Sequence, residues 1–102
     1  MNKTANNKRT TIPRIFEYDK QFYKDWKRLN NCGRYNMNKL KEVMLLLIAN
    51  NKALPESYKD HELTNYNGVR ECHIGGDFLL MYLIEDDVIV FIRAGTHSEL
   101  FV

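Results

Sequence analysis

The sequence predicts an α+β fold, in which a small antiparallel sheet carries two N-terminal helices on one face and the element order is strand, helix, helix, strand, strand, strand (βααβββ). Two observations support this prediction. Apolar residues recur at helical spacing between residues 19 and 50, and apolar segments separated by turn residues occupy residues 69–94. A chain of 102 residues has room for one such domain.

The first helix is predicted to follow a leader and a short strand. Residues 1–13 are polar and basic without periodicity, which predicts a disordered leader and leaves 14–102 as a single domain. Residue types that favour strands occur over Arg14–Tyr18. Asp19 then suits the N-cap of a helix that ends near residues 30–33. The apolar stripe of this helix consists of Phe22, Trp26 and Leu29.

A second helix is predicted from Met37 to about Asn50, with Asn36 as its N-cap. Its broad apolar face consists of Leu40, Val43, Met44, Leu47 and Ile48. Residues 51–67 have no regular period and contain Pro55, so they predict a long connection. Long connections inside small domains often carry function.

The C-terminal third predicts three consecutive antiparallel strands joined by tight turns. The expected strands are Val69–Ile74, Phe78–Ile84 and Val88–Ala94. Residues 75–77 and 85–87 form the turns between them. We expect the first strand of the domain to join this sheet at an edge or next to the last strand.

Composition restricts the classes of protein to which the chain can belong. Its 44% hydrophobic and 27% charged residues are typical of globular proteins and not of disordered chains. No apolar run reaches the roughly 18 residues of a membrane span and no signal-peptide segment occurs, which predicts a cytoplasmic protein. A net charge of +2 permits an RNA partner without the strongly basic surface of a nucleic-acid coat. Cys32 and Cys72 form no Cys-x-x-Cys motif and are expected to be free thiols.

All three histidines lie in the second half of the chain. His73 and Asp77 flank one predicted hairpin turn, so their side chains can approach each other. His97 reaches the same end of the sheet if its strand runs parallel to the strand of His73, whereas His61 lies in the long connection. Cleavage of RNA by its own 2′-OH needs a base, an acid and positive charge near the phosphate. Imidazoles can fill either proton-transfer role near neutral pH.

Other residues offer contacts to RNA, each with a structural alternative. The cations that could bind phosphate oxygens are Arg70, Arg93 and Lys59, and each could instead form an ion pair with Asp60, Glu71 or Glu99. Phe101 is a candidate for an exposed ring that stacks on a base, whereas Tyr66 is ambiguous. Each histidine could also be structural. Together with the aspartate the histidines could bind zinc, although no spacing matches a familiar zinc motif.

Several separated segments closely resemble the YafQ family of toxins, a branch of the RelE/ParE superfamily. They are Met37–Leu40, Tyr58–Leu63, Gly68–Ile74 with Asp77, and Arg93–Phe101. The resemblance runs from about Phe16 to Phe101 in the same order. It implies a RelE-like, microbial RNase-like fold. It also implies a ribosome-dependent endoribonuclease that cuts messenger RNA, is neutralised by a cognate antitoxin and needs no cofactor.

The resemblance also implies a set of functional residues. The catalytic set falls on His61, His73, Asp77 and His97, and Phe101 is the aromatic residue that positions the RNA. We expect His97 to act as general acid at the leaving 5′-oxygen, and Asp77 or His73 to act on the 2′-OH. His61 is expected to orient the phosphate, and Arg93 to add positive charge. No metal is required, because the internal 2′-OH replaces an activated water.

Two other functions share this architecture. The chain could be a catalytically silent corepressor, which binds its antitoxin and through it operator DNA. It could also be a gyrase inhibitor of the ParE type. The intact set of three histidines and one aspartate favours the ribonuclease over both. One departure from the family pattern is Gly75-Gly76, which is expected to loosen the turn before Asp77.

Overall fold

The computed structural model describes residues 12–101, so the predicted leader lies outside the described residues except for its last two positions. The helices and strands follow the predicted order and add three short elements to it. The elements are β1 (Ile15–Tyr18), α1 (Lys20–Cys32), α2 (Met37–Ala49), the 3-10 helix η2 (Glu56–Tyr58), β2 (His61–Glu62), β3 (Arg70–Gly75), β4 (Phe78–Glu85), β5 (Val88–Thr96) and α3 (His97–Leu100). The additions are η2, β2 and α3, which are too short to produce a periodic pattern.

The strands form one five-stranded sheet in the order β1-β5-β4-β3-β2. Strands β2, β3, β4 and β5 pair antiparallel with one another, and the antiparallel pairing of β3, β4 and β5 was predicted. β1 lies at the edge next to β5 and runs parallel to it, so the sheet is mixed. The parallel pairing is possible because α1 and α2 lie between β1 and the meander in sequence and carry the chain back to the other end of the sheet.

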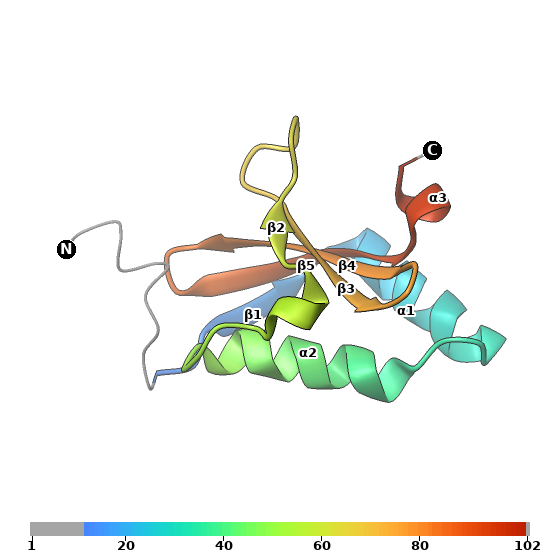
Figure 1. The fold of residues 1–102 in the computed structure, drawn as a ribbon, viewed down its shortest axis with the longest axis horizontal. Helices are drawn as coiled ribbons and strands as arrows, with labels where there is room; N and C mark the ends of the chain where they lie inside the picture. Colours follow the sequence, from blue (N-terminus) through green and yellow to red (C-terminus); the bar gives the residue numbers. More distant parts are fainter. Residues whose placement is uncertain (1–11, 102) are drawn as a thin grey trace.

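The two long helices leave one face of the sheet open. Figure 1 shows α2 running along one side of the sheet, while the loop after β2 and the C-terminal α3 project on the other side. Residues on alternate positions of a strand face opposite sides of a sheet, so β3 to β5 contribute to both faces. The helical side holds the main core and the open side holds the candidate site.

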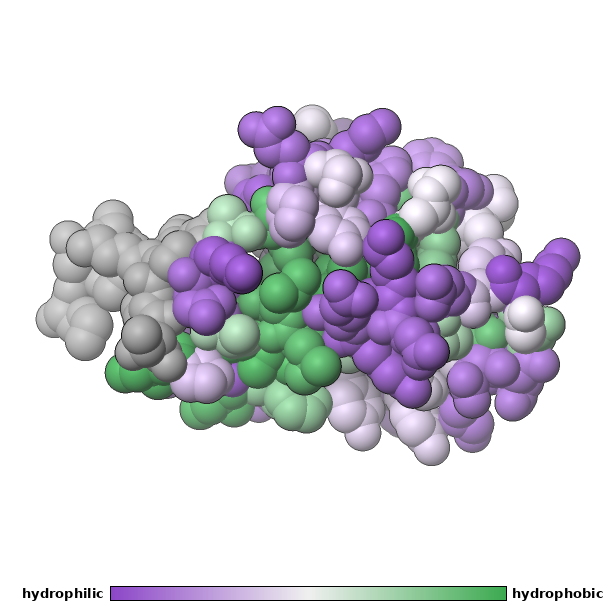
Figure 2. Space-filling view, turned by 60° about the horizontal axis from the view of Figure 1, so that its bottom comes forward, coloured by the Kyte–Doolittle hydropathy of each residue, from purple (hydrophilic) through white to green (hydrophobic). Residues whose placement is uncertain are grey.

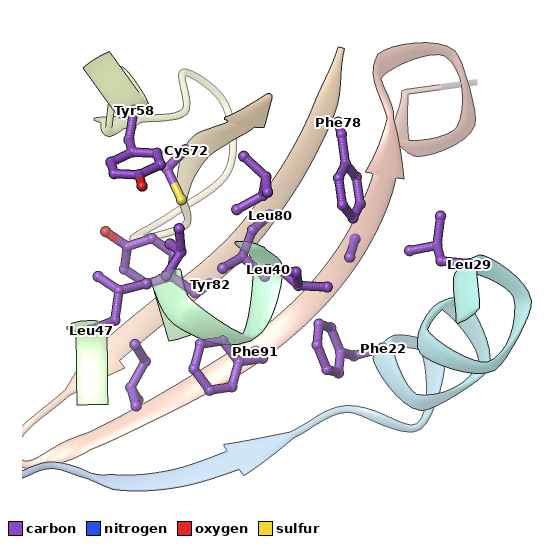
Figure 3. Packing of buried hydrophobic residues seen from close by; sticks show 14 residues of the cluster. Phe22, Leu29, Leu40, Leu47, Tyr58, Cys72, Phe78, Leu80, Tyr82 and Phe91 are labelled. Carbon is purple, nitrogen blue, oxygen red and sulfur yellow. The ribbon is translucent and has the colours of Figure 1, made fainter. Parts of the chain in front are cut away.

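The core lies between the helices and the sheet (Figure 3). The predicted apolar faces of both helices are confirmed: Phe22 and Leu29 of α1 are buried, and Trp26 packs partly buried against them. The buried residues of α2 are Leu40, Val43 and Leu47. The sheet and η2 supply the other members, which are Tyr58, Cys72, Ile74, Phe78, Leu80, Tyr82, Ile89, Phe91 and Ala94.

The helix ends follow local sequence signals. Asn36 caps α2 by accepting a hydrogen bond of 3.0 Å from the backbone N–H of Lys39. Asp19 occupies the N-cap position of α1 as predicted, but its side chain makes no capping hydrogen bond. Gly33 is the C-cap of α1, and its φ of 71° is the left-handed conformation that glycine adopts without strain.

Both cysteines are free thiols, as predicted. Cys72 is fully buried in the core, and burial raises the pKa of its thiol far above the usual value, so Cys72 stays protonated and unreactive. Cys32 is exposed near the end of α1. Within residues 12–101, no helix has the length and apolar character needed to cross a membrane.

The two faces of α2 predict a stability difference. Leu40 is fully buried, so Leu40→Ala should lower the free energy of unfolding by about 2–5 kcal/mol through lost burial and a residual cavity. Leu45 on the same helix is 65% exposed, so Leu45→Ala should change it by less than about 1 kcal/mol. Urea unfolding of both variants measures the two values. Equal losses would contradict the assignment of the buried face.

Candidate functional site

The histidines of β2 and β3 lie on the open face of the sheet. Glu71 and His73 alternate with Cys72, which points into the core under the helices. They therefore face the side that α1 and α2 leave open. β2 brings in His61, which pairs directly with Glu71 in the antiparallel register. Thus β2, which the sequence analysis read as loop, places His61 beside His73.

These residues surround a buried carboxylate. His61 Nε2 lies 3.6 Å from Glu71 Oε1, and His73 Nε2 lies 4.0 Å from the same oxygen. The two imidazole rings are 6.4 Å apart between centroids. The Glu71 side chain is only 7% exposed, whereas His61 and His73 are 48% and 32% exposed. Glu71 therefore lies beneath two histidines that solvent or a ligand can reach.

The turn between β3 and β4 joins this cluster to the C-terminal segment. His73 Nδ1 lies 3.3 Å from the backbone oxygen of Gly76. In the same turn, Asp77 Oδ1 accepts a hydrogen bond of 3.2 Å from the backbone N–H of His97. β3 and β5 both run antiparallel to β4, so their C-terminal ends lie at one end of the sheet, as the sequence analysis required for His97. The structure thus brings His73, Asp77 and His97 together around one turn.

The turn at Gly75-Gly76 makes fixed contacts, although these glycines were expected to loosen it. Gly76 has a φ of 55°, the left-handed conformation in which glycine is unstrained, and its carbonyl oxygen faces His73. The pairing of β3 with β4 shifts register between His73 and Gly75, which marks a bulge. The glycines therefore permit the backbone geometry that positions the histidine and Asp77.

α3 presents His97 and an aromatic group. The helix begins with a capping box, in which Thr96 and Glu99 bond to each other's backbone N–H groups. The ring of Phe101 lies 4.8 Å from that of His97 between centroids. Tyr66, from the loop after β2, meets Phe101 edge-on at 5.9 Å. Tyr66, which was ambiguous in the sequence, therefore belongs to the same aromatic group.

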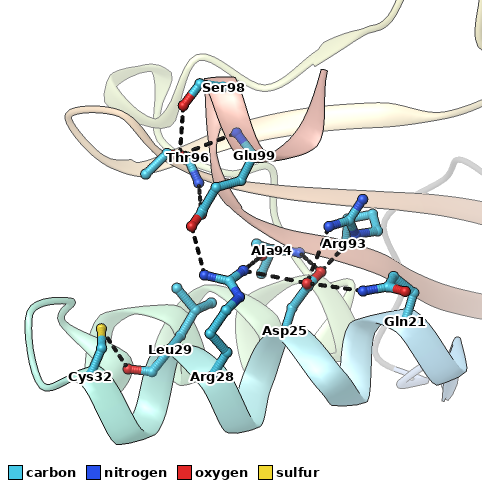
Figure 4. A network of polar contacts seen from close by, with 10 residues as sticks. All are labelled: Gln21, Asp25, Arg28, Leu29, Cys32, Arg93, Ala94, Thr96, Ser98 and Glu99. Carbon is cyan, nitrogen blue, oxygen red and sulfur yellow. Dashed lines mark hydrogen bonds and ion pairs between the residues drawn. The ribbon is translucent and has the colours of Figure 1, made fainter. Parts of the chain in front are cut away.

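A buried carboxylate of α1 holds the end of β5 (Figure 4). Asp25 is 2% exposed and accepts hydrogen bonds from the backbone N–H of Ala94 at 3.0 Å and from Arg93 Nε at 2.8 Å. Burial alone would raise the pKa of Asp25, but the hydrogen bonds and charge of Arg93 and the Ala94 bond outweigh it, so the pKa is lowered. Asp25 is therefore ionised in a folded protein at neutral pH.

The same helix contacts α3 through Arg28. Arg28 Nη1 donates to Glu99 Oε2 at 2.8 Å, and Arg28 Nη2 lies 3.4 Å from Asp25 Oδ1. Gly95 leaves room for this bridge, because a Cβ atom there would lie 2.7 Å from Glu99 Oε1. Asp25 and Arg28 thus connect α1 to both β5 and the helix that carries His97.

The three cations predicted to bind RNA have different surroundings. Arg93 is engaged by Asp25, a partner that the sequence analysis did not name. Arg70 pairs with Asp60 at 3.1 Å, as its structural alternative foresaw, and lines a polar hollow of ≈ 390 Å³ beside the end of α2. Arg70 lies two residues before Cys72 on β3, so it faces the helical side of the sheet, opposite to His73. Lys59 is exposed next to the site, and its backbone oxygen lies 2.7 Å from His61 Nδ1.

Comparison with known proteins decides the family. A family model described as the bacterial toxin of a type II toxin-antitoxin system, YafQ, matches residues 14–102. The chain belongs to the YafQ family. This YafQ-family chain is 45% identical over 91 residues to the mRNA interferase toxin YafQ of Escherichia coli BL21-DE3, covering 88% of this chain and 98% of that protein.

Solved structures of related toxins have the same fold as this YafQ-family chain. The crystal structure of the E. coli DinJ–YafQ complex matches with a TM-score of 0.79 at 44% identity, covering 87% of this chain and 99% of that one. A metal-bound toxin from Helicobacter pylori matches with a TM-score of 0.77 at 36% identity, covering 86% and 99%. In the described part of this chain, no group of three or more histidine, cysteine, aspartate or glutamate side chains is arranged to hold a metal ion.

Sequence reasoning missed two carboxylates at this YafQ-family site, Glu71 and Asp25. Glu71 was considered only as an ion-pair partner for an arginine or Lys59, although its position two residues before His73 on one strand places both on one face. Asp25 lies three residues after Phe22 and four before Leu29, on the apolar stripe of α1. A single charge on an apolar stripe is the signal that could have identified it, because buried charges are paired.

The buried pair of Asp25 predicts a pH-dependent contribution to stability. At neutral pH, Asp25→Asn should lower the free energy of unfolding by about 3 kcal/mol, because it leaves Arg93 without its charge partner. A lowered pKa means that the ionised carboxylate stabilises the fold above the unfolded-state pKa of about 3.9, and that this contribution is lost as pH falls through the lower folded value. Urea unfolding should show the difference from the parent shrinking below about pH 4.

Asp19→Asn is the matched control for this prediction. Asp19 begins the same helix, is exposed and makes no capping hydrogen bond with its side chain. Its substitution should change the free energy of unfolding by less than about 0.5 kcal/mol. A difference between Asp25→Asn and the parent that stays constant down to about pH 2 would show that the charge of Asp25 contributes nothing.

Proposed function

We propose that this chain is a ribosome-dependent endoribonuclease that cleaves messenger RNA without a metal ion. It acts by attack of the RNA 2′-OH on the adjacent phosphorus, with acid and base catalysis by His and Asp side chains. The observation that carries the proposal is the turn at residues 75–77, which bonds to His73 on one side and to His97 on the other. The activity in the name of the E. coli relative supports the same conclusion.

The cluster supplies the groups that such a cleavage needs. His97 protonates the leaving 5′-oxygen, and Asp77 or His73 removes the proton of the 2′-OH. The phosphorus gains a bond to the 2′-oxygen and loses the bond to the 5′-oxygen, which leaves a 2′,3′-cyclic phosphate. His61 orients the phosphate from the opposite side of the cluster. Lys59, Arg70 and Arg93 remain predicted RNA contacts, and Arg93 would act while still paired with Asp25.

The aromatic group beside His97 is suited to hold the base next to the scissile bond. Phe101 and Tyr66 present two rings from separate segments, and Phe101 also contacts His97. Unpaired RNA bases stack on such rings, at about 1–3 kcal/mol per base. A base held there would fix the 5′-oxygen close to the imidazole that protonates it.

A cognate antitoxin is the proposed partner that neutralises the toxin and through which it contacts operator DNA. The E. coli relative has been crystallised with DinJ. Figure 2 shows apolar residues gathered beside hydrophilic ones on the side where α2 lies. The exposed large apolar side chains in the described part include Ile15, Phe16 and Tyr18 of β1, Tyr23 of α1 and Leu45 of α2. A contiguous exposed apolar area, such as Figure 2 shows on the side of α2, is typical of a surface that a partner covers.

Replacement of the proposed acid tests the cleavage activity. We expect induction of the parent chain in bacteria to stop growth and to produce new 5′ ends inside translated codons, mapped by primer extension. His97→Ala should reduce cleavage by about 10²–10⁴-fold, because it removes the proposed proton donor to the leaving oxygen. Ser98→Ala, the next exposed position on α3, is the matched control and should cleave like the parent.

Two outcomes of this experiment would favour the other functions. Growth arrest by the parent and His97→Ala without new 5′ ends would favour a gyrase inhibitor. No arrest and no cleavage by the parent would favour a silent corepressor.

Chelation tests the absence of a metal from the reaction. The attacking group belongs to the RNA, so we expect purified chain on programmed ribosomes to cleave equally before and after it is dialysed against EDTA, with Mg²⁺ restored for the ribosome in both samples. Loss of cleavage that returns only with Zn²⁺ or Cu²⁺ would overturn the metal-free mechanism and align this chain with the metal-bound relative.

A further inference from the structure

The hydrogen-bonding capacity of the groups around Glu71 determines where protons lie in the cluster. A backbone carbonyl oxygen only accepts hydrogen bonds. His61 Nδ1 lies 2.7 Å from the oxygen of Lys59, and His73 Nδ1 lies 3.3 Å from that of Gly76. Both Nδ1 atoms must therefore carry a proton. In a neutral imidazole the other nitrogen, Nε2, is then an unprotonated acceptor.

Both Nε2 atoms face an oxygen that also accepts. Glu71 Oε1 lies 3.6 Å from Nε2 of His61 and 4.0 Å from Nε2 of His73. Two acceptors that face each other repel unless a proton lies between them. A proton on either Nε2 makes that ring an imidazolium ion beside a carboxylate, which is attractive at this distance.

The burial of Glu71 favours such a charge. Its side chain is 7% exposed, and its Oε2 atom is buried with no hydrogen-bond partner among the described residues. The β4 residues that pair with Glu71 and His73 are Met81 and Leu79, both buried and apolar. A buried carboxylate next to apolar side chains is stabilised when a cation lies beside it. In the described part of the chain, the groups in ion-pair range that become cations on protonation are the two imidazoles.

We propose that Glu71 is a positioning residue that keeps a proton on Nε2 of His61, His73 or both, so that the cluster offers the scissile phosphate a positively charged imidazole. This inference depends on the proposed ribonuclease function in one respect only. That function identifies the anion that meets the charged imidazole as the scissile phosphate of RNA. An imidazole that is protonated at both nitrogens has no lone pair to accept a proton. A histidine held in this way acts through its charge and its N–H groups, so where His73 is the protonated ring, Asp77 is the group that removes the proton of the 2′-OH.

Nitrogen NMR of labelled imidazoles tests this inference directly. In the purified full-length parent at pH 7, we expect His61, His73 or both to give the signals of a doubly protonated ring. In Glu71→Gln the carboxamide can donate to Nε2, so that signature should be lost and replaced by that of a neutral ring with a proton on Nδ1. Glu71→Asp keeps the negative charge and should restore much of the signature, which a merely structural role would not do.

Two internal controls accompany the experiment. Glu62→Gln removes the neighbouring exposed carboxylate of β2, which points to the other face, and should leave both histidines unchanged. His97 does not contact Glu71 and should give the same signals in every variant. If Glu71→Gln fails to fold, the parent spectrum still decides, because neutral signals from both His61 and His73 in the parent overturn the proposal. Unchanged protonation in a folded Glu71→Gln overturns it equally.

This experiment separates the inference from the proposed function. It measures protonation in the absence of RNA, so it can succeed when the cleavage assay with His97→Ala fails. If cleavage depends on His97 but His61 and His73 are both neutral, the ribonuclease function stands. Glu71 then has no part in its mechanism.

Discussion

Within residues 12–101, β1 pairs with β5 only as far as Phe91, so the last residues of β5 have no strand beside them on that side. A buried carboxylate makes the contact there that a strand would otherwise make. Asp25 of α1 accepts the hydrogen bond of the Ala94 N–H, which would otherwise bond to an adjacent strand. Arg93 balances its charge, and Arg28 extends the contact to Glu99. The position of α3, and with it the position of His97, depends on this attachment of a helix to a strand edge.

The site is built from two groups that a single turn connects. One group lies on β2 and β3 and contains two histidines around Glu71, and the other lies on the last residues of the described chain. The turn at residues 75–77 contacts the first through the Gly76 oxygen and the second through Asp77. Groups fixed in this way before a ligand arrives need little reorganisation when charge develops on a phosphate.

The sequence predicted the main elements because they have strong periodic patterns. It also indicated that His73, Asp77 and His97 can converge, provided that the first and third strands of the meander are parallel, which they are. It named a place next to the last strand as one alternative for β1, but it could not reveal the parallel direction of that pairing, since pairing across the whole chain leaves no local signal. β2 has only two residues, and Glu71 resembles a surface charge until the burial of its neighbours is known.

The attachment of α1 to β5 also determines when the site can form during folding. The Asp25–Ala94 and Arg28–Glu99 contacts join residues 69 and 71 positions apart. Contacts across such long loops form after local ones, because the entropy of loop closure must be overcome before they stabilise the chain. The meander, whose turns are short, can therefore assemble first. We infer that a chain caught at that stage has its two β-strand histidines in place but no anchored His97, so that the candidate site is complete only after the last cooperative step of folding.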